Sequence, residues 1–242
     1  MQKTPIDWCD WSSNPEKGCQ GPVVNGKHQP CEWCYAADNY ARFHPDRDFR
    51  VPQFFPKELV KMEKVLSRER STQLVFLDSM GDLYDEAVYP IWRHQIYVVC
   101  SRLPEHIFLV LTKQPENMTG SIPPTNVWLG VSVTSLEDRH RIETLKCANR
   151  VSKKFISFEP LLGCVGKHAT LTELLCGIDW VIIGGLAGRK KLLPKPKWVY
   201  EIASACADNE IPMFFKNNMA GYDLSEDRIL WCRDYPAPIK RR

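Results

Sequence analysis

The stretch from Cys19 to Tyr35, CQGPVVNGKHQPCEWCY, constrains the chain most, because it carries three of the ten cysteines. Glycine and proline punctuate it and its hydrophobic periodicity is weak, which is typical of a loop. Two residues separate Cys31 from Cys34, and eleven separate Cys19 from Cys31. Three thiolates on one loop can hold three corners of a metal site and leave the fourth open for chemistry, whereas structural zinc sites are closed by four ligands.

Composition limits the class of protein without naming a function. The net charge of +3 permits an acidic partner such as nucleic acid but does not require one. We find no run of about 18 apolar residues, so we expect no membrane span. The first residues lack the pattern of a signal peptide, so we expect a cytoplasmic protein whose cysteines stay reduced.

From residue 72 onward, near-continuous apolar runs alternate with amphipathic segments. A short strand is expected earlier, at 6–11, and helices at 35–43 and 57–70. The later strands are expected at 72–78, 106–112, 127–133, 153–160, 179–186 and 212–218. Helices are expected between them at 91–102, 135–148, 170–176 and 196–208. This alternation indicates a parallel sheet covered by helices.

We therefore predict an α/β fold with a single domain over 1–242, shaped as a partial or distorted (β/α) TIM-type barrel with parallel strands. The cluster loop spans 12–35 and a C-terminal tail spans 219–242. A doubly wound open sheet is the alternative, but no GxGxxG fingerprint follows the early strands.

Chemically useful residues gather where the expected strands end, which is where a parallel barrel places its site. They are Ser79, Met80, Gly81, Asp82, Lys113, Ser132, Glu159, Gly184, Gly185 and Lys216. Each also has a structural interpretation. Asp82 could cap the next helix, and Ser135 with Asp138 is a capping signal. Glu159 follows an apolar run and needs a partner such as Lys113 or Lys216.

These motifs support a family comparison. A three-cysteine loop after the first strand of a β/α succession, with Trp33 before the last cysteine, resembles the radical S-adenosylmethionine (SAM) superfamily. The usual spacing there has three residues between the first two cysteines, whereas this chain has eleven. The motifs WSSNP, SMGDL, LTKQPEN, NVWLGVSV, FISFEPLLG, DWVIIGG and FFK are similar, in this order, to a phage and prokaryotic three-cysteine family of unknown function that is regarded as radical-SAM-like. After Gly185 that family usually has Glu-Ser-Gly, where this chain has Leu-Ala-Gly.

The resemblance implies an enzyme with a 4Fe–4S cluster on Cys19, Cys31 and Cys34. SAM would bind the open iron and be cleaved reductively to a 5′-deoxyadenosyl radical, with a flavodoxin- or ferredoxin-type protein as electron donor. The SAM contacts that it implies are Trp33, Ser79, Met80, Gly81, Asp82, Ser132, Glu159, Gly184 and Gly185. Lys113, Glu159 and Lys216 are the candidates for orienting SAM or substrate.

A different class of function stays open at this point. Zinc on Cys19, Cys31, Cys34 and either Cys9 or His28 would stabilise a nucleic-acid-binding protein. Its contacts to nucleic acid would be the aromatic and basic segment 40–55 and the tail Lys240-Arg241-Arg242. The substrate of an enzyme is equally open among nucleic acids, nucleosides and protein side chains.

Overall fold

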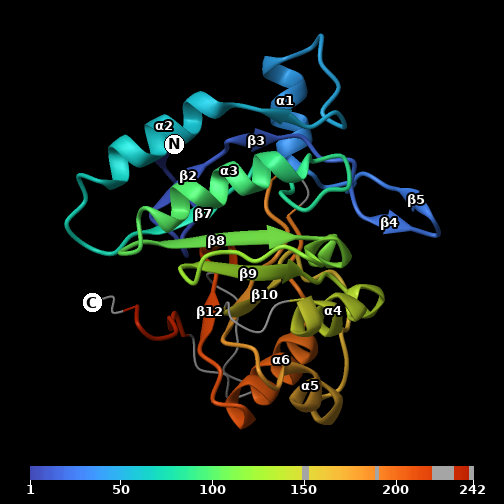
Figure 1. The fold of residues 1–242 in the computed structure, drawn as a ribbon. Coiled ribbons are helices and arrows are strands. Elements are labelled where there is room, and N and C mark those ends of the chain that lie inside the picture. Colours follow the sequence, from blue (N-terminus) through green and yellow to red (C-terminus); the bar gives the residue numbers. More distant parts are fainter. Residues whose placement is uncertain (149–152, 189–190, 220–231, 240–242) are drawn as a thin grey trace. The chain divides into compact units, whose positions relative to one another are not determined.

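The computed structural model describes residues 1–148, 153–188, 191–219 and 232–239. The chain divides into two compact units, Met1–Leu129 and Gly130–Arg242. Both units mix helices with strands, and both contain parallel strand pairs (Figure 1). Strand β9 (Val127–Ser132) carries the chain from the first unit into the second.

The first unit is built on four neighbouring strands. In spatial order they are β1 (Gln2–Lys3), β2 (Trp11–Ser13), β7 (Leu74–Leu77) and β8 (Ile107–Thr112). The pair β1–β2 is antiparallel, whereas β2–β7 and β7–β8 are parallel. All four side chains of β7 are buried, as expected for a parallel strand covered on both faces.

Two small antiparallel strand pairs and three helices complete this unit. Strand β3 (Glu16–Lys17) pairs with β6 (Gln53–Phe54), and β4 (Val23–Val24) pairs with β5 (Lys27–His28), both antiparallel. The helices are α1 (Tyr35–Phe43), α2 (Pro56–Leu66) and α3 (Pro90–Ser101), and the 3₁₀ turn η1 spans Pro115–Met118. Figure 1 shows β4 and β5 projecting away from the rest of the unit.

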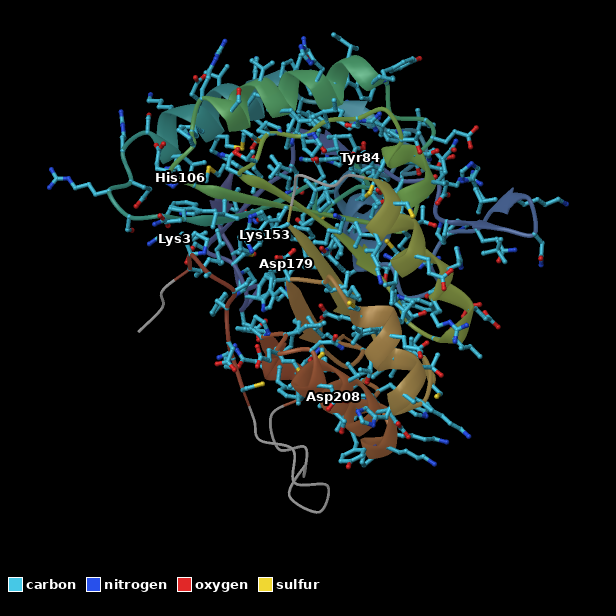
Figure 2. All side chains as sticks on the ribbon, turned by 60° about the horizontal axis from the view of Figure 1, so that its bottom comes forward. Lys3, Tyr84, His106, Lys153, Asp179 and Asp208 are labelled. Atoms are coloured by element: carbon cyan, nitrogen blue, oxygen red, sulfur yellow. The ribbon has the colours of Figure 1, made fainter. Side chains whose placement is uncertain are left out.

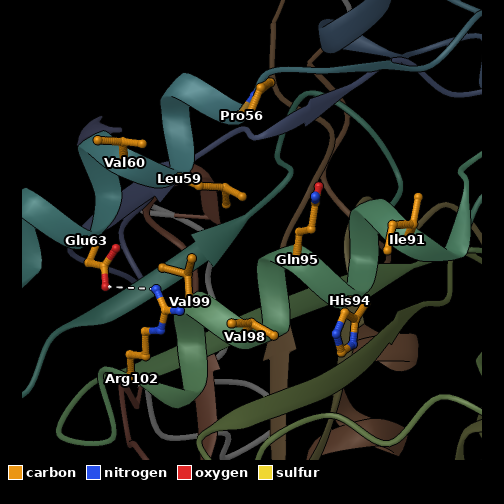
Figure 3. Close-up of a pocket in the computed structure, with 10 residues that line it drawn as sticks. All are labelled: Pro56, Leu59, Val60, Glu63, Ile91, His94, Gln95, Val98, Val99 and Arg102. Atoms are coloured by element: carbon orange, nitrogen blue, oxygen red, sulfur yellow. Dashed lines mark ion pairs between the residues drawn. The ribbon is translucent and has the colours of Figure 1, made fainter.

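Helices α2 and α3 lie side by side and enclose a surface groove with an apolar lining (Figure 3). Leu59 and Val60 line it from α2, and Ile91 and Val98 line it from α3. An ion pair of 3.6 Å between Glu63 and Arg102 links the two helices. The groove contains none of the residues that the sequence analysis assigned to chemistry.

The second unit repeats the α/β theme. Its parallel strands are β10 (Lys154–Phe158), β11 (Trp180–Ile183) and β12 (Met213–Phe215). Its helices are α4 (His140–Ala148), α5 (His168–Leu175) and α6 (Pro196–Asp208), with the 3₁₀ turns η2 (Leu136–Asp138) and η3 (Asn217–Met219). Its ion pairs include Lys153 with Asp179 at 2.9 Å, both labelled in Figure 2, and His168 with Asp208 at 2.7 Å.

The predicted alternation of parallel strands and helices is confirmed, with three local corrections. The first strand is Trp11–Ser13 rather than 6–11, because residues 7–8 form a turn that buries Trp8 against Phe76. The segment 135–148 is not one helix but η2 followed by α4. The side chain of Ser135 makes no capping hydrogen bond, and the Asp138 carboxylate accepts from the N–H and hydroxyl of Thr134 rather than from Ser135.

Other predictions remain predictions: closure of a barrel, and a single domain over 1–242. Most of the tail 219–242 lies outside the described residues, as do Arg189, Lys190 and Lys240-Arg241-Arg242. None of the helices in the described part of the chain has the length and hydrophobicity that a membrane crossing needs.

Candidate functional site

The three cysteines of the loop lie in the first unit and are half-buried. Cys19 follows β3, and its Sγ accepts a hydrogen bond from the N–H of Gly21 at 3.2 Å. Cys34 is the N-cap of α1, where its Sγ accepts from Ala37 at 3.4 Å, and its own N–H donates to the carbonyl of Cys31 at 3.1 Å. Amide donors to sulfur stabilise thiolates and are among the means by which proteins tune iron–sulfur ligands.

The segment between Cys19 and Cys31 is not the plain loop that its composition predicts, because it contains the hairpin β4–β5. Asn25 and Gly26 form its two-residue turn with φ of 51° and 73°. Both central residues have positive φ in a type I′ hairpin turn, for which Asn-Gly is the strongest short sequence signal. That signal is present in VVNGKH, and the loop prediction was wrong in overlooking it.

The hairpin closes at its base, so the chain returns to its starting point. The N–H of Gln29 donates to the carbonyl of Pro22 at 3.0 Å, and a Cβ on Gly21 would lie 2.2 Å from the Gln29 carbonyl oxygen. Residues 22–29 are thus an excursion of eight residues. Taking these eight from the eleven between Cys19 and Cys31 leaves three, namely Gln20, Gly21 and Pro30.

The loop after β7 packs against the start of the cysteine loop. The side-chain oxygen of Asn14 accepts from the Ser79 hydroxyl at 3.0 Å and from the Met80 N–H at 2.9 Å. The N–H of Gly18 donates to the carbonyl of Met80 at 3.0 Å, and Gly18 bridges to Gly81. Residues 79–81 therefore lie beside the chain that leads into Cys19.

A buried acid that the sequence analysis missed, Glu16, lies directly behind Gly81. A Cβ on Gly81 would be 2.1 Å from Oε2 of Glu16. Glu16 has no exposed surface, and neither of its carboxylate oxygens has a hydrogen-bond partner among the described residues. Burial, followed by the charges of Asp78 and Asp82, raises the pKa of Glu16 well above its usual value.

Lys113 and Asp82 follow the strands β8 and β7, and the charges of both act on Cys19. The Asp82 carboxylate accepts from the Lys113 backbone N–H at 2.9 Å. Burial alone would lower the pKa of Lys113, but negative charge on Cys31, Cys19, Asp82 and Cys34 outweighs it and raises that pKa. One ammonium group is thus close enough to interact with all three thiolates.

The pKa of the Cys19 thiol is raised, first by burial and then by the carboxylates of Asp82 and Asp85. Ionised Cys19 therefore needs compensating positive charge. Lys113 supplies part of it, and a bound metal would supply more.

The two residues considered as a fourth zinc ligand are engaged elsewhere. Nδ1 of His28 lies 2.9 Å from the carbonyl of Gly21, and its Nε2 lies 3.3 Å from Glu86. Cys9 is buried in the N-terminal turn, 3.9 Å from the carbonyl of Ile6. Within the described residues, no three His, Cys, Asp or Glu side chains are grouped around a single ion position.

In the second unit, the predicted residues Glu159 and Lys216 form an ion pair. Gly184 lies against both: a Cβ there would be 3.0 Å from Cδ of Lys216 and 3.2 Å from Cγ of Glu159. Asn218 accepts from the Gly185 N–H at 3.2 Å and donates to the Gly185 carbonyl at 2.7 Å. The structure thus brings the ends of β10, β11 and β12 together, and Lys216 is the partner that Glu159 requires.

The remaining predicted residues have simpler surroundings. Ser132 is buried at the end of β9, where its carbonyl accepts from the Arg141 guanidinium at 2.9 Å. Trp33 is half-buried in the turn that precedes Cys34.

Two further buried polar residues of the first unit, Asp85 and Gln114, hydrogen-bond to the cysteine loop and were not predicted. Gln114 follows Lys113 directly within the quoted motif LTKQPEN, so its position at a strand end was the available signal. Asp85 lies beyond the strand end in a segment that reads as an ordinary loop.

Comparisons with known proteins agree with this description of the fold. A family profile described as "Protein of unknown function (DUF5131)" matches residues 3–226. No curated protein matches. A solved structure of spore photoproduct lyase, a cysteine-to-serine mutant, is similar with a TM-score of 0.53 and 10% sequence identity. The match covers 87% of this chain but 64% of that one, so the chain spans less than two thirds of the length of its structural relative.

Proposed function

The chain belongs to the DUF5131 family of proteins of unknown function, and we propose that it is a radical SAM-type enzyme with a 4Fe–4S cluster on Cys19, Cys31 and Cys34. The fold similarity to spore photoproduct lyase, a radical SAM enzyme, supports this proposal at the level of architecture. At 10% identity it carries no residue assignments, so the assignments rest on the cysteine loop.

The observation that carries the proposal is the closed base of the hairpin. Without the excursion 22–29, the loop reads Cys-Gln-Gly-Pro-Cys-Glu-Trp-Cys, with three residues and then two between its cysteines. Three residues between the first two cysteines is the usual spacing of the radical SAM superfamily, which the eleven-residue gap in the sequence had obscured. The long gap in sequence is therefore compatible with three cluster ligands on one loop.

The chemistry of the donor set also fits a cluster. Amide hydrogen bonds reach the sulfurs of Cys19 and Cys34, and Lys113 offsets the negative charge of the thiolates. Three thiolates would leave one iron of such a cluster free to bind SAM, and the cluster would supply the electron needed for reductive cleavage of SAM.

The chain's own residues would then bind and orient SAM and the substrate. In the first unit, Ser79–Asp82 are proposed to contact SAM together with Trp33. In the second unit, Ser132, Glu159 and Gly184-Gly185 are the proposed SAM contacts, and Lys216 holds the Glu159 carboxylate in place. Lys113 and Lys216 remain candidates for contacting substrate. We expect a flavodoxin- or ferredoxin-type electron donor, and nucleic acid is one of several substrate classes to test.

Anaerobic reconstitution with iron and sulfide tests the proposal. Wild type should bind close to four iron and four sulfide per chain, with a brown colour that bleaches on reduction. Cys34→Ala should lose most of this cluster. The matched control is Cys147→Ala, which changes an exposed cysteine of α4 and should behave as wild type.

Two results would contradict the proposal. One is a Cys34→Ala protein that binds as much cluster as wild type. The other is purified protein with about one zinc per chain and no sulfide, which would favour the zinc-stabilised alternative. If the cluster forms, formation of 5′-deoxyadenosine from SAM in the presence of dithionite tests the cleavage step.

A further inference from the structure

Motion of the hairpin 22–29 would be transmitted to the cysteine loop that carries it. Cys19 is separated from the base of the hairpin by Gln20 and Gly21 only. Val23 and Val24 are 44% and 39% exposed, so the projecting hairpin has little apolar burial of its own to hold it in place. Any motion at its base would displace Cys19, so something must fix residues 20–21.

Asp85 and Gln114 supply that fixation. Oδ2 of Asp85 accepts from the Gln20 N–H at 2.7 Å, and Nε2 of Gln114 donates to the Gly21 carbonyl at 3.2 Å. The two side chains also bind each other, with Nε2 of Gln114 2.9 Å from Oδ2 of Asp85. Together they bind the N–H of Gln20 and the carbonyl of Gly21, which fixes the path of the chain directly after Cys19.

Both side chains are themselves held by further hydrogen bonds. Asp85 is 1% exposed and accepts at Oδ1 from the Ala87 N–H at 2.9 Å. Gln114 has no exposed surface and accepts at Oε1 from the N–H of Glu86 and the side-chain amide of Asn117, both at 3.3 Å. Every polar atom of the pair is thus assigned a partner, which fixes the orientation of the Gln114 amide.

From this geometry we propose that Asp85 and Gln114 are positioning residues that hold Cys19 in register with Cys31 and Cys34. The proposal deepens the function proposed above, since it concerns the same cluster loop. In this role Asp85 and Gln114 hold Gln20 and Gly21, which connect Cys19 to the base of the hairpin. They are not among the residues proposed to contact SAM, and they act on Cys19 through Gln20 and Gly21.

The chemistry of the pair dictates the informative substitutions. Gln114→Met keeps the length of the side chain but removes the donor to Gly21 and to Asp85. Gln114→Glu replaces the donor with a carboxylate oxygen, which repels Oδ2 of Asp85 and the carbonyl of Gly21. Asp85→Asn places an NH₂ group against N–H donors on one side or the other. Each change should release residues 20–21 while leaving all three cysteines in the chain.

The matched control is Asn126→Leu. Asn126 is also an amide side chain of the first unit that donates to backbone carbonyls, those of Cys100, Leu103 and His106, at 2.9 to 3.1 Å. Its removal should destabilise the protein without touching the cysteine loop. It therefore separates a general loss of stability from a specific loss of position at Cys19.

The first measurement needs no cluster. Metal-free protein is alkylated with iodoacetamide, and the rates at Cys19, Cys31 and Cys34 are compared by peptide mass spectrometry. Gln114→Met should raise the rate at Cys19, relative to the other two, by about tenfold or more, because it removes hydrogen bonds to Gly21 and to the charged Asp85. Asp85→Asn should raise this rate as well, but it also removes a negative charge that raises the pKa of Cys19, so Gln114→Met is the deciding variant. Asn126→Leu should leave this ratio unchanged.

The second measurement is cluster assembly. The Gln114 and Asp85 variants should bind less than half the wild-type iron and sulfide, or show an altered electron paramagnetic resonance signal after reduction. A wild-type ratio of alkylation in Gln114→Met would overturn the positioning role. If that variant does not fold, Gln114→Glu carries the same comparison.

The two proposals can fail separately. A change in Cys19 alkylation with no cluster in any protein would support the positioning role and refute the cluster. Normal clusters in wild type and in every Asp85 and Gln114 variant, with unchanged alkylation, would support the cluster and refute the positioning role.

Discussion

Gly81→Ala should destabilise the first unit, because the space that a methyl group would occupy is already filled by Glu16. The added Cβ would lie 2.1 Å from Oε2, 2.9 Å from Cδ and 3.0 Å from Oε1 of Glu16. The φ of Gly81 is not in the left-handed region, so the backbone itself accepts alanine and the cost arises from this contact.

The magnitude follows from the limited freedom of Glu16. Its side chain is fully buried and cannot turn toward solvent, so either backbone or side chain must shift. Overpacking of this kind costs about 1–3 kcal/mol. For a chain of this length each kcal/mol lowers Tm by roughly 2–4 °C, so we expect a decrease of about 2–12 °C.

Urea unfolding of four proteins measures the effect: wild type, Gly81→Ala, Glu16→Ala and the double variant. In the Glu16→Ala background the methyl group has room, so Gly81→Ala should cost about 1–3 kcal/mol less there than in wild type. If Gly81→Ala costs the same in both backgrounds, Glu16 is not the reason for glycine at this position. In that case the role of Gly81 in approaching a ligand would become the better explanation.

Three further predictions follow from the same geometry. Glu16→Gln should become more stable relative to wild type as the pH rises. The raised pKa of Glu16 means that the folded protein favours protonated Glu16; this stabilisation is complete below about pH 4.5 and is lost as the pH rises above it and Glu16 ionises. Equal differences in unfolding free energy between the two proteins at pH 5 and pH 8 would contradict this. Deleting residues 22–29 should leave the cluster content after reconstitution close to wild type, since the hairpin closes at its base; loss of the cluster with retained folding would show that the excursion is needed. Lys216→Met should cost about 1–3 kcal/mol by leaving the Glu159 carboxylate without its cation, and adding Glu159→Gln should recover part of that loss in thermal unfolding.

Helices were predictable where local signals agree. The bounds of α1 and α6 match the predicted 35–43 and 196–208, and α6 begins with a proline in its first turn. The buried strands β8 and β10 were equally predictable, since a continuous apolar run is visible in the sequence itself. The expected parallel pairing follows from the alternation of such strands with helices.

The first strand could not be located by the same reasoning. Strand β2 has only three residues, and its Ser12 and Ser13 are buried polar side chains. An apolar pattern therefore favours the preceding segment, where Trp8 is buried from a turn. Burial of Trp8 against Phe76 depends on tertiary packing, which periodicity does not report.

The candidate site was predictable for residues at strand ends and not for those that act through tertiary contacts. A cationic partner for Glu159 was anticipated because a shielded carboxylate needs a cation, and of the two candidates, Lys113 and Lys216, the structure has Lys216. Asp85 and Gln114 were missed, since a buried hydrogen bond to residues 65 or 93 positions away in sequence leaves no local pattern. Glu16 was missed because its burial is visible only in the folded chain.

The closed hairpin also bears on how such sites can be searched for. A pattern that fixes the number of residues between cysteines would pass over this chain, although the separation along the folded backbone is short once residues 22–29 are bypassed. Patterns that allow a turn-forming Asn-Gly segment of variable length between the first two cysteines would include it. The same turn at Asn25-Gly26 offers a point for grafting a reporter peptide, since length added there does not alter the spacing of the residues on either side.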